Sequence, residues 1–235
     1  MLFNLLQTQA AADTAALAET LAAPVQEKTL NLIDMAAAGG LLMIVLLLLS
    51  VMAIYIFGSK WWMIHKASQI DKNFMKDIHD LIHDGKIKSA LELCQRYDSP
   101  VARLVEKGIE RIGRPLQDIQ TAVENTGGVE VARLEKGLPM LATIAGGAPM
   151  IGFLGTVTGM IEAFFRMSTA GNNIDITLLS GGIYEAMVTT VGGLFVGIIA
   201  YFGYNFLTSQ ISNLVFKMER TTIEFIDMLH EPSDN

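Results

Sequence analysis

The fold class is decided by one uncharged stretch, Met35–Ser59, which reads MAAAGGLLMIVLLLLSVMAIYIFGS. A helix that crosses a bilayer needs about 20 mostly apolar residues, so this stretch is long enough to span a membrane. Two further stretches have the same character: Gly137–Ile161 is uncharged, and Ile176–Asn205 carries a single charge, Glu185. With only 17% charged residues in the chain, these stretches predict an all-α integral membrane protein with three transmembrane helices.

Basic residues are concentrated in one segment, because 13 of the 17 Lys and Arg residues lie between Lys60 and Lys136. Positive charge collects on the cytoplasmic side of short membrane-protein loops. We therefore predict an N-terminus outside, a large cytoplasmic segment and a C-terminus inside, with Trp61 and Trp62 at the cytoplasmic interface. Basic and acidic residues are interspersed in that segment, so nothing indicates binding to nucleic acid.

These patterns divide the chain into seven predicted segments. They are an outer N-terminal segment, read either as an interfacial helix or as a frayed terminus (1–32), a first span (33–57), a cytoplasmic helical domain (58–136), a second span (137–165), an outer turn (166–176), a third span (177–207) and a cytoplasmic C-terminal helix and tail (208–235). The second and third spans are predicted to continue as long helices into the cytoplasmic domain.

The cytoplasmic domain shows three apolar stripes at helical spacing, each ended by a Gly or Pro signal. They are Ile70, Phe74, Ile78 and Ile82; Ile87, Ala90, Leu91 and Cys94; and Val101, Leu104, Val105, Gly108, Ile109 and Ile112. From Leu116 the helical pattern runs into the second span, and Gly127-Gly128 is the one strong breaker on the way. The single cysteine, Cys94, is interpreted as a buried, reduced thiol without catalytic partners.

Small residues recur four apart in the second and third spans, where they let helix backbones approach closely inside lipid. The positions that we assign to helix packing are Gly152, Gly155, Gly159, Gly193 and Gly197. The first span is rich in Leu, Ile and Val and lacks this pattern. We therefore expect the first span at the lipid-facing periphery and the other two in an interior.

Glu185 is the most informative single residue, because a carboxylate inside an apolar span costs about 2.5–3.5 kcal/mol on insertion scales. It should face water, a partner or a cation, or be protonated. The alternative starts the span near Ala186 and leaves Glu185 at the interface. Thr156, Thr189 and Thr190 supply further polar groups for an ion pathway. Glu162 and Arg166, one helical turn apart, are expected to form an ion pair.

Two segments of the spans resemble a known family. Ala148–Met160 (APMIGFLGTVTGM), followed by Ala163-Phe164, is similar to a signature of the ExbB/TolQ/MotA proton-channel proteins. Ile183–Leu194 (IYEAMVTTVGGL) is similar to the second signature of that family. Three spans and a short outer N-terminus favour the ExbB or TolQ type over the four-span MotA type.

The resemblance implies a ring-forming oligomer, a pentamer of this subunit around a dimer of a single-span partner of the ExbD/TolR type. The partner's membrane aspartate would carry the proton, and the motion would pass to a TonB- or TolA-like periplasmic protein. The implied location is the bacterial inner membrane, with a periplasmic N-terminus. By position, Thr156 and Thr190 match the family's pore-facing threonines, and Glu185 matches its membrane glutamate.

The residues by themselves leave several alternatives open. The helical period favours Thr189 as the neighbour of Glu185, whereas the family signature favours Thr190. A TolQ-like role in a Tol-Pal-type envelope complex, and a structural membrane scaffold without an ion path, stay as alternatives to the ExbB-like role. We expect no enzymatic activity and no cofactor. His79 and His83 share a helix face but lack a third metal ligand.

Overall fold

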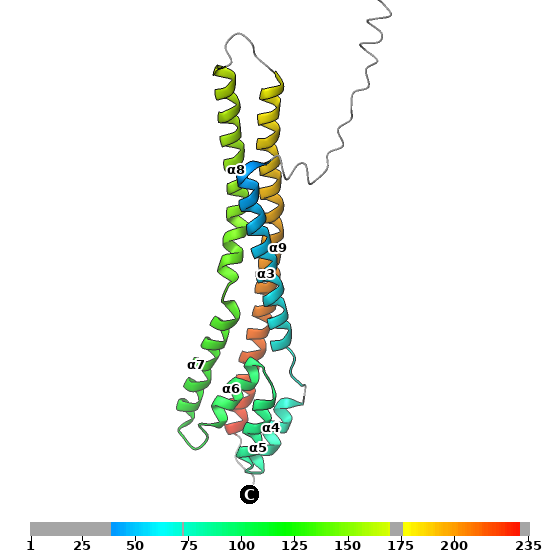
Figure 1. Ribbon diagram of the computed structural model, residues 1–235. Helices are drawn as coiled ribbons and strands as arrows, with labels where there is room; N and C mark the ends of the chain where they lie inside the picture. The colour runs from blue at the N-terminus through cyan, green and yellow to red at the C-terminus, as the bar shows by residue number, and fades with distance from the viewer. Residues whose placement is uncertain (1–38, 72, 170–175, 231–235) are drawn as a thin grey trace, which may run out of the picture. The chain divides into compact units, whose positions relative to one another are not determined.

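The computed structural model describes residues 39–71, 73–169 and 176–230, and the helices in these ranges are labelled α3 to α9 (Figure 1). They are α3 (Gly40–Ala67), α4 (Phe74–His83), α5 (Ile87–Arg96), α6 (Pro100–Ile109), α7 (Leu116–Glu135), α8 (Leu138–Thr169) and α9 (Ile176–His230). These ranges contain helices and connections but no strand. The predicted N-terminal segment, the start of the first span, most of the outer turn and the end of the tail lie outside the described residues.

Three helical stretches are long and apolar enough to cross a membrane: Gly40–Ala67, Leu116–Thr169 and Leu179–His230. They confirm the prediction of an all-helical protein with three candidate spans. In Figure 1 the antiparallel helices α8 and α9 lie side by side, and α3 runs along them. Most of α3 has its large apolar side chains exposed, among them Leu41, Ile44 and Leu48. A surface of this composition suits contact with lipid.

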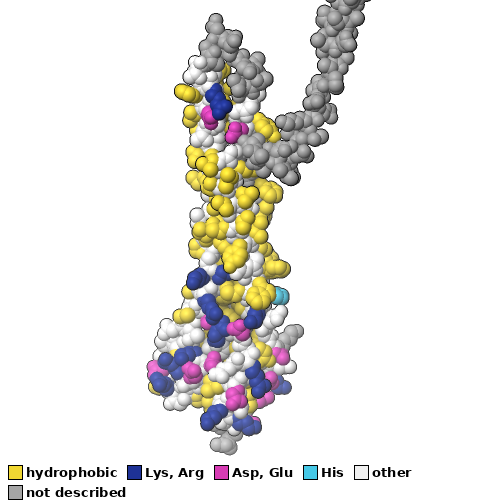
Figure 2. Space-filling view, in the orientation of Figure 1, with side chains coloured by type: hydrophobic (Ala, Val, Ile, Leu, Met, Phe, Trp, Pro, Cys, Tyr) yellow, Lys and Arg dark blue, Asp and Glu magenta, His cyan; other side chains and the backbone are white. Residues whose placement is uncertain are grey.

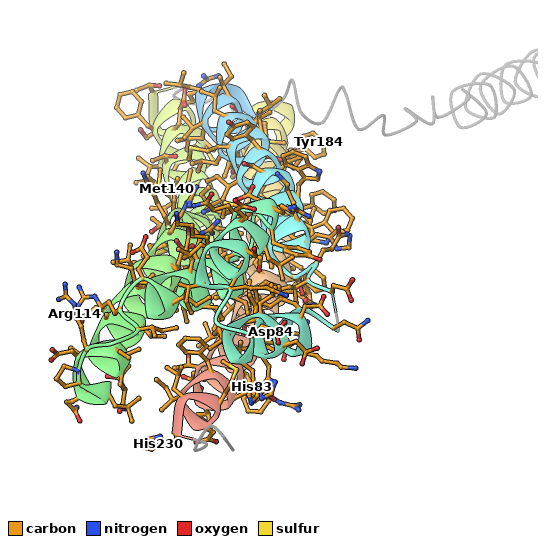
Figure 3. The ribbon with its side chains drawn as sticks, turned by 90° about the horizontal axis from the view of Figure 1, so that it is seen from below. His83, Asp84, Arg114, Met140, Tyr184 and His230 are labelled. Atoms are coloured by element: carbon orange, nitrogen blue, oxygen red, sulfur yellow. The ribbon has the colours of Figure 1, made fainter. Side chains whose placement is uncertain are left out.

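The short helices α4, α5 and α6 form a helical body beside the far end of α9. Most of their buried residues come from the three apolar stripes, for example Ile78 in α4, Ala90 in α5 and Val105 in α6. The α9 extension closes this core with Phe225, which contacts α6 at Gly108. Seen from below, α7, which follows Arg114, lies on one side of α9 and the α4–α5 pair on the other (Figure 3).

The break between α7 and α8 falls at Lys136–Gly137, where Gly137 has φ +95°. Gly127 and Gly128 lie inside α7 instead. The sequence pattern had indicated this pair as the one strong helix breaker in the segment. A glycine inside a helix costs only about 1 kcal/mol, so a helix can run through it. A positive φ is different, because it strains any residue with a Cβ and therefore requires glycine at the turn itself.

A polar network joins the end of α3 to α6 and α7. Arg103 in α6 donates to both carboxylate oxygens of Glu130 in α7, at 2.9 and 2.7 Å, and to Asp98 at 3.0 Å. Lys66 in α3 donates to the other Asp98 oxygen at 3.0 Å. The neighbouring Ser99 hydroxyl donates to the carbonyl of Ala67 at 3.1 Å. These bonds hold the end of the first span against the helical body.

This network also displaces the pKa values of Asp98 and Arg103. The hydrogen bond from Lys66 lowers the pKa of Asp98, with a further contribution from Arg103. The hydrogen bonds to Glu130 raise the pKa of Arg103, so its guanidinium stays charged. Glu130 is 7% exposed, and its charge is balanced by a bidentate partner as a buried carboxylate requires.

Candidate functional site

Glu185 lies on α9 with its side chain exposed, and it lines a cavity of about 480 Å³. The cavity is formed by three helices and the residue before α3. Its lining comprises Gly39, Gly40, Leu41, Leu42, Gly155, Thr158, Gly159, Glu162, Ala163, Arg166, Gly181, Gly182, Glu185 and Thr189. It therefore combines one carboxylate from the third span with an ion pair and a hydroxyl from the second.

The start of α3 approaches the Glu185 carboxylate closely because residue 40 is glycine. Gly40 has φ +60°, and a Cβ at this position would lie 2.8 Å from Glu185 Oε1. A larger residue would be strained by the backbone conformation and would also collide with the carboxylate. Gly39 and Gly40 have no predicted role in the sequence, since they follow an alanine run that is typical of any span.

Glu162 and Arg166 form the expected ion pair across one turn of α8, and both side chains are about 60% exposed. An exposed pair of this kind adds little stability, so its interest lies in the charge that it brings to the cavity. Thr158, one turn before Glu162, was missed in the sequence. The signal in the sequence was its spacing, because residues four apart, such as Thr158 and Glu162, lie on the same face of a helix.

Thr189 and Glu185 share the cavity, as the helical period indicated. Thr189 is 3% exposed, and its hydroxyl donates to the Ala186 carbonyl at 2.8 Å. It fills the space opposite Gly155, where an added Cβ would lie 2.3 Å from Thr189 Oγ1. Thr189 is thus enclosed between α8 and α9, next to the exposed carboxylate.

Thr156 and Thr190 lie outside this cavity. Thr190 is five residues after Glu185, which places it roughly 140° around α9 from the carboxylate. Its hydroxyl donates across the helix pair to the Gly152 carbonyl at 3.0 Å. Thr156, one turn after Gly152, donates to the Phe153 carbonyl at 2.6 Å. The four polar residues therefore divide between two flanks of the α8–α9 pair.

The five glycines assigned to packing all lie between α8 and α9. A Cβ on Gly152 would be 2.9 Å from the Thr189 carbonyl oxygen, and one on Gly193 would be 2.6 Å from that of Ala148. The corresponding contacts are 2.9 Å from Gly159 to Ala186 Cβ and 2.5 Å from Gly197 to Pro149 Cγ. No room for a side chain remains at any of these five glycines, which sets the register of the two helices.

The chemistry available at these two flanks is that of proton and water handling. Each of the three threonine hydroxyls donates to a backbone carbonyl, which leaves its oxygen lone pairs free to accept hydrogen bonds from water or from a protonated carboxyl group. Within the described ranges, no group of three or more His, Cys, Asp or Glu side chains could hold a metal ion.

The sequence matches the profile of the MotA/TolQ/ExbB proton channel family over residues 96–220, more than half of the chain. The chain belongs to this family. The match spans α6 to most of α9, and so includes both helices that form the small-residue contact. It is a family of membrane proton channels and is not known as a family of enzymes.

Named relatives of this family include both ExbB and TolQ proteins. A putative biopolymer transport protein ExbB homolog of Methanothermobacter thermautotrophicus is 28% identical over 193 residues, 80% of this chain and 67% of the relative. The biopolymer transport protein ExbB of Xanthomonas campestris pv. campestris is 36% identical over 90 residues, 38% of this chain and 35% of the relative. The Tol-Pal system protein TolQ of Haemophilus influenzae is 36% identical over 101 residues, 43% and 44% of the two chains.

Proposed function

We propose that this protein is an ExbB-like subunit of an inner-membrane motor that the proton-motive force drives. In this proposal it forms a homopentamer around a dimer of an ExbD-like single-span partner. The complex conducts protons and energises a TonB-like protein for import across the outer membrane. Membership of the proton-channel family supports the proposal, as does the ExbB name of relatives that align with most of the chain.

The observation that carries the proposal is the exposed Glu185 carboxylate in an otherwise uncharged span. In lipid such a group would cost about 2.5–3.5 kcal/mol, so its exposure in one protomer implies water or a protein partner in the assembly. The cavity beside it contains Thr189 and the Glu162–Arg166 pair, which makes this end of the helix pair polar enough to admit water.

We assign two parts to the ion path: the polar cavity that holds Glu185 and Thr189, which admits water, and the flank that carries Thr156 and Thr190, which faces the partner. The first span packs on the other flank, where Gly39 approaches Thr189 and Phe57 approaches Gly203. The Thr156–Thr190 flank is therefore left for neighbouring subunits and the partner. One carboxylate and a few hydroxyls make a thin relay, so the titrating group is expected on the partner. This subunit supplies the ring and the polar lining.

The test measures uptake of an iron chelate, driven by the proton-motive force, in cells that lack their own ExbB-type protein. The cells produce this chain together with its single-span partner. Glu185→Ala and Thr156→Ala are each expected to lower uptake at least tenfold, a loss of about 1.4 kcal/mol or more in the coupling step. Thr143→Ala is the matched control, since Thr143 is an exposed α8 threonine with the same kind of backbone hydrogen bond, 2.8 Å to Pro139. Full uptake in both test variants would refute the site.

A second candidate function is that of a TolQ-like subunit in a Tol-Pal-type envelope complex. The 36% identity to the Haemophilus TolQ protein favours it. The two roles separate by complementation: a TolQ-like protein restores detergent resistance to cells that lack TolQ and does not restore iron uptake to cells that lack ExbB. A structural scaffold without an ion path would give a third set of results. Apolar replacements of Glu185 and of the threonines would then be tolerated, whereas replacements of Gly155 and Gly159 would not.

A further inference from the structure

Three basic side chains lie together where the uncharged stretches of α3 and α8 meet the helical body, and we name them the cationic corner: Lys60, Arg133 and Lys136. Lys60 Nζ donates to the backbone carbonyls of Arg133 and Leu134, at 3.4 and 3.3 Å. The charges of Lys136 and Arg133 both act on the Lys60 ammonium group. Figure 2 shows Lys and Arg side chains gathered at this end of the apolar stem.

The cationic corner has no anionic partner within residues 39–71, 73–169 and 176–230. None of its three side chains forms an ion pair there. Glu130 and Asp98, which line one cavity together with Arg133, are already bound by Arg103 and Lys66. Glu135, which lies between Arg133 and Lys136 in the chain, forms no ion pair with any of the three. Arg133 and Lys136 are exposed. Three like charges held together repel one another, so an anion at this position would be stabilised.

An apolar groove of about 300 Å³ runs along the spans beside this corner. Its lining comes from all three spans and includes Ala53, Phe57, Leu141, Ala200, Gly203 and Phe206. Two contacts connect it to the corner. Phe57 stacks on Trp61, the residue after Lys60, with ring centroids 6.5 Å apart. Leu141 lies one turn after Gly137, whose Cβ position would be 3.6 Å from Lys60 Cε.

The geometry points to a binding site for an anionic phospholipid, with the phosphate at the cationic corner and an acyl chain in the apolar groove. A basic pocket between spans at the membrane surface is the arrangement that recognises anionic headgroups. Trp61 and Trp62 are 53% and 71% exposed, and indole rings of this kind lie at headgroup level. The lipid would join α3 to the α7–α8 turn. This inference depends on membrane insertion and not on proton conduction, so it stands or fails separately from the proposed function.

The two tryptophans of the chain, Trp61 and Trp62, provide a local probe because both adjoin Lys60. The full-length protein is reconstituted in phosphatidylcholine vesicles that contain a minor fraction of phosphatidylglycerol brominated on its acyl chain. Tryptophan quenching is compared with that by the same fraction of brominated phosphatidylcholine. We expect stronger quenching by the anionic lipid, and a preference that falls about fivefold for each basic residue removed from the corner.

The test variants are Lys136→Gln and the double variant Arg133→Gln/Lys136→Gln, all at exposed positions where folding is expected to persist. The matched control is Lys88→Gln/Arg114→Gln, which removes the same charge from exposed positions on the helical body. Loss of the preference in the test variants, with the control unchanged, supports the site. Equal loss in the control would show diffuse attraction and overturn it. Absence of any preference in the wild type, or its removal by inorganic phosphate, would overturn it as well.

Discussion

Replacing Gly193 by alanine tests the α8–α9 contact most directly. The new Cβ would lie 2.6 Å from the carbonyl oxygen of Ala148 and 2.9 Å from the Cα of Gly152. Both neighbours are backbone atoms, so relief requires the two helices to separate by a few tenths of an ångström or more. Inserting a methyl group into a well-packed contact costs about 1–3 kcal/mol. Alanine recovers about 1 kcal/mol of helix propensity, which leaves a net loss of up to about 2 kcal/mol.

The matched control for this prediction is Gly146→Ala in α8. Gly146 is an exposed helical glycine, and a Cβ there would meet nothing within 4 Å. The control should therefore gain up to about 1 kcal/mol from helix propensity alone. The free energy of unfolding of both variants is measured in detergent micelles by denaturant titration with far-ultraviolet circular dichroism. If Gly193→Ala is as stable as Gly146→Ala, the close approach of the helices does not limit packing and the reasoning fails.

Three further predictions concern the helical body. Arg103→Ala should lower the free energy of unfolding by about 2 kcal/mol, which is less than for a fully buried ion pair because Arg103 is 29% exposed. Adding Glu130→Gln removes the unpaired charge and should recover part of this loss in denaturant titrations. A double variant less stable than the single one would contradict the argument. Burial of the Cys94 thiol, with a smaller contribution from the negative charge of Glu106, raises its pKa to about 12. Alkylation of Cys94 at pH 8, followed by mass spectrometry, should therefore be roughly a thousand times slower in the folded protein than in the unfolded one. Comparable rates in the two states would refute this. The pKa of Asp98 is lower in the folded protein than in the unfolded chain, where it is about 4. The stability that Asp98 contributes is therefore complete above the unfolded-state pKa and should be lost as the pH falls through the folded-state pKa. Asp98→Asn should abolish this loss of stability at acid pH.

Much of the helical body could be predicted from local sequence. The stripes that contain Phe74, Ile87 and Val101 place apolar residues on one face of a helix, and burial of that face needs no knowledge of its partner. The position of the turn before the second span was less accessible. Gly127, Gly128 and Gly137 look alike in a sequence, and only the path of the chain decides which one adopts a positive φ.

The candidate site shows the same division. The glutamate and the threonines are recognisable because polar groups are rare in apolar spans. Their grouping is a different matter: Thr189 lies with Glu185 in one cavity, and Thr190 bonds to the Gly152 carbonyl on the other flank. Periodicity separates the two threonines by angle, but it cannot say which flank the first span occupies.

The sequence by itself determined the membrane class and the three spans, because crossing a bilayer depends on the length and polarity of one continuous segment. It also indicated the family, because the two signatures are each contained in one helix. The tertiary structure alone decided which residues meet across helices. Lys60 reaches the carbonyls of Arg133 and Leu134, which are more than seventy positions away, and Gly40 reaches Glu185. Such meetings depend on how helices pack, and the charge or period of a single segment does not encode that.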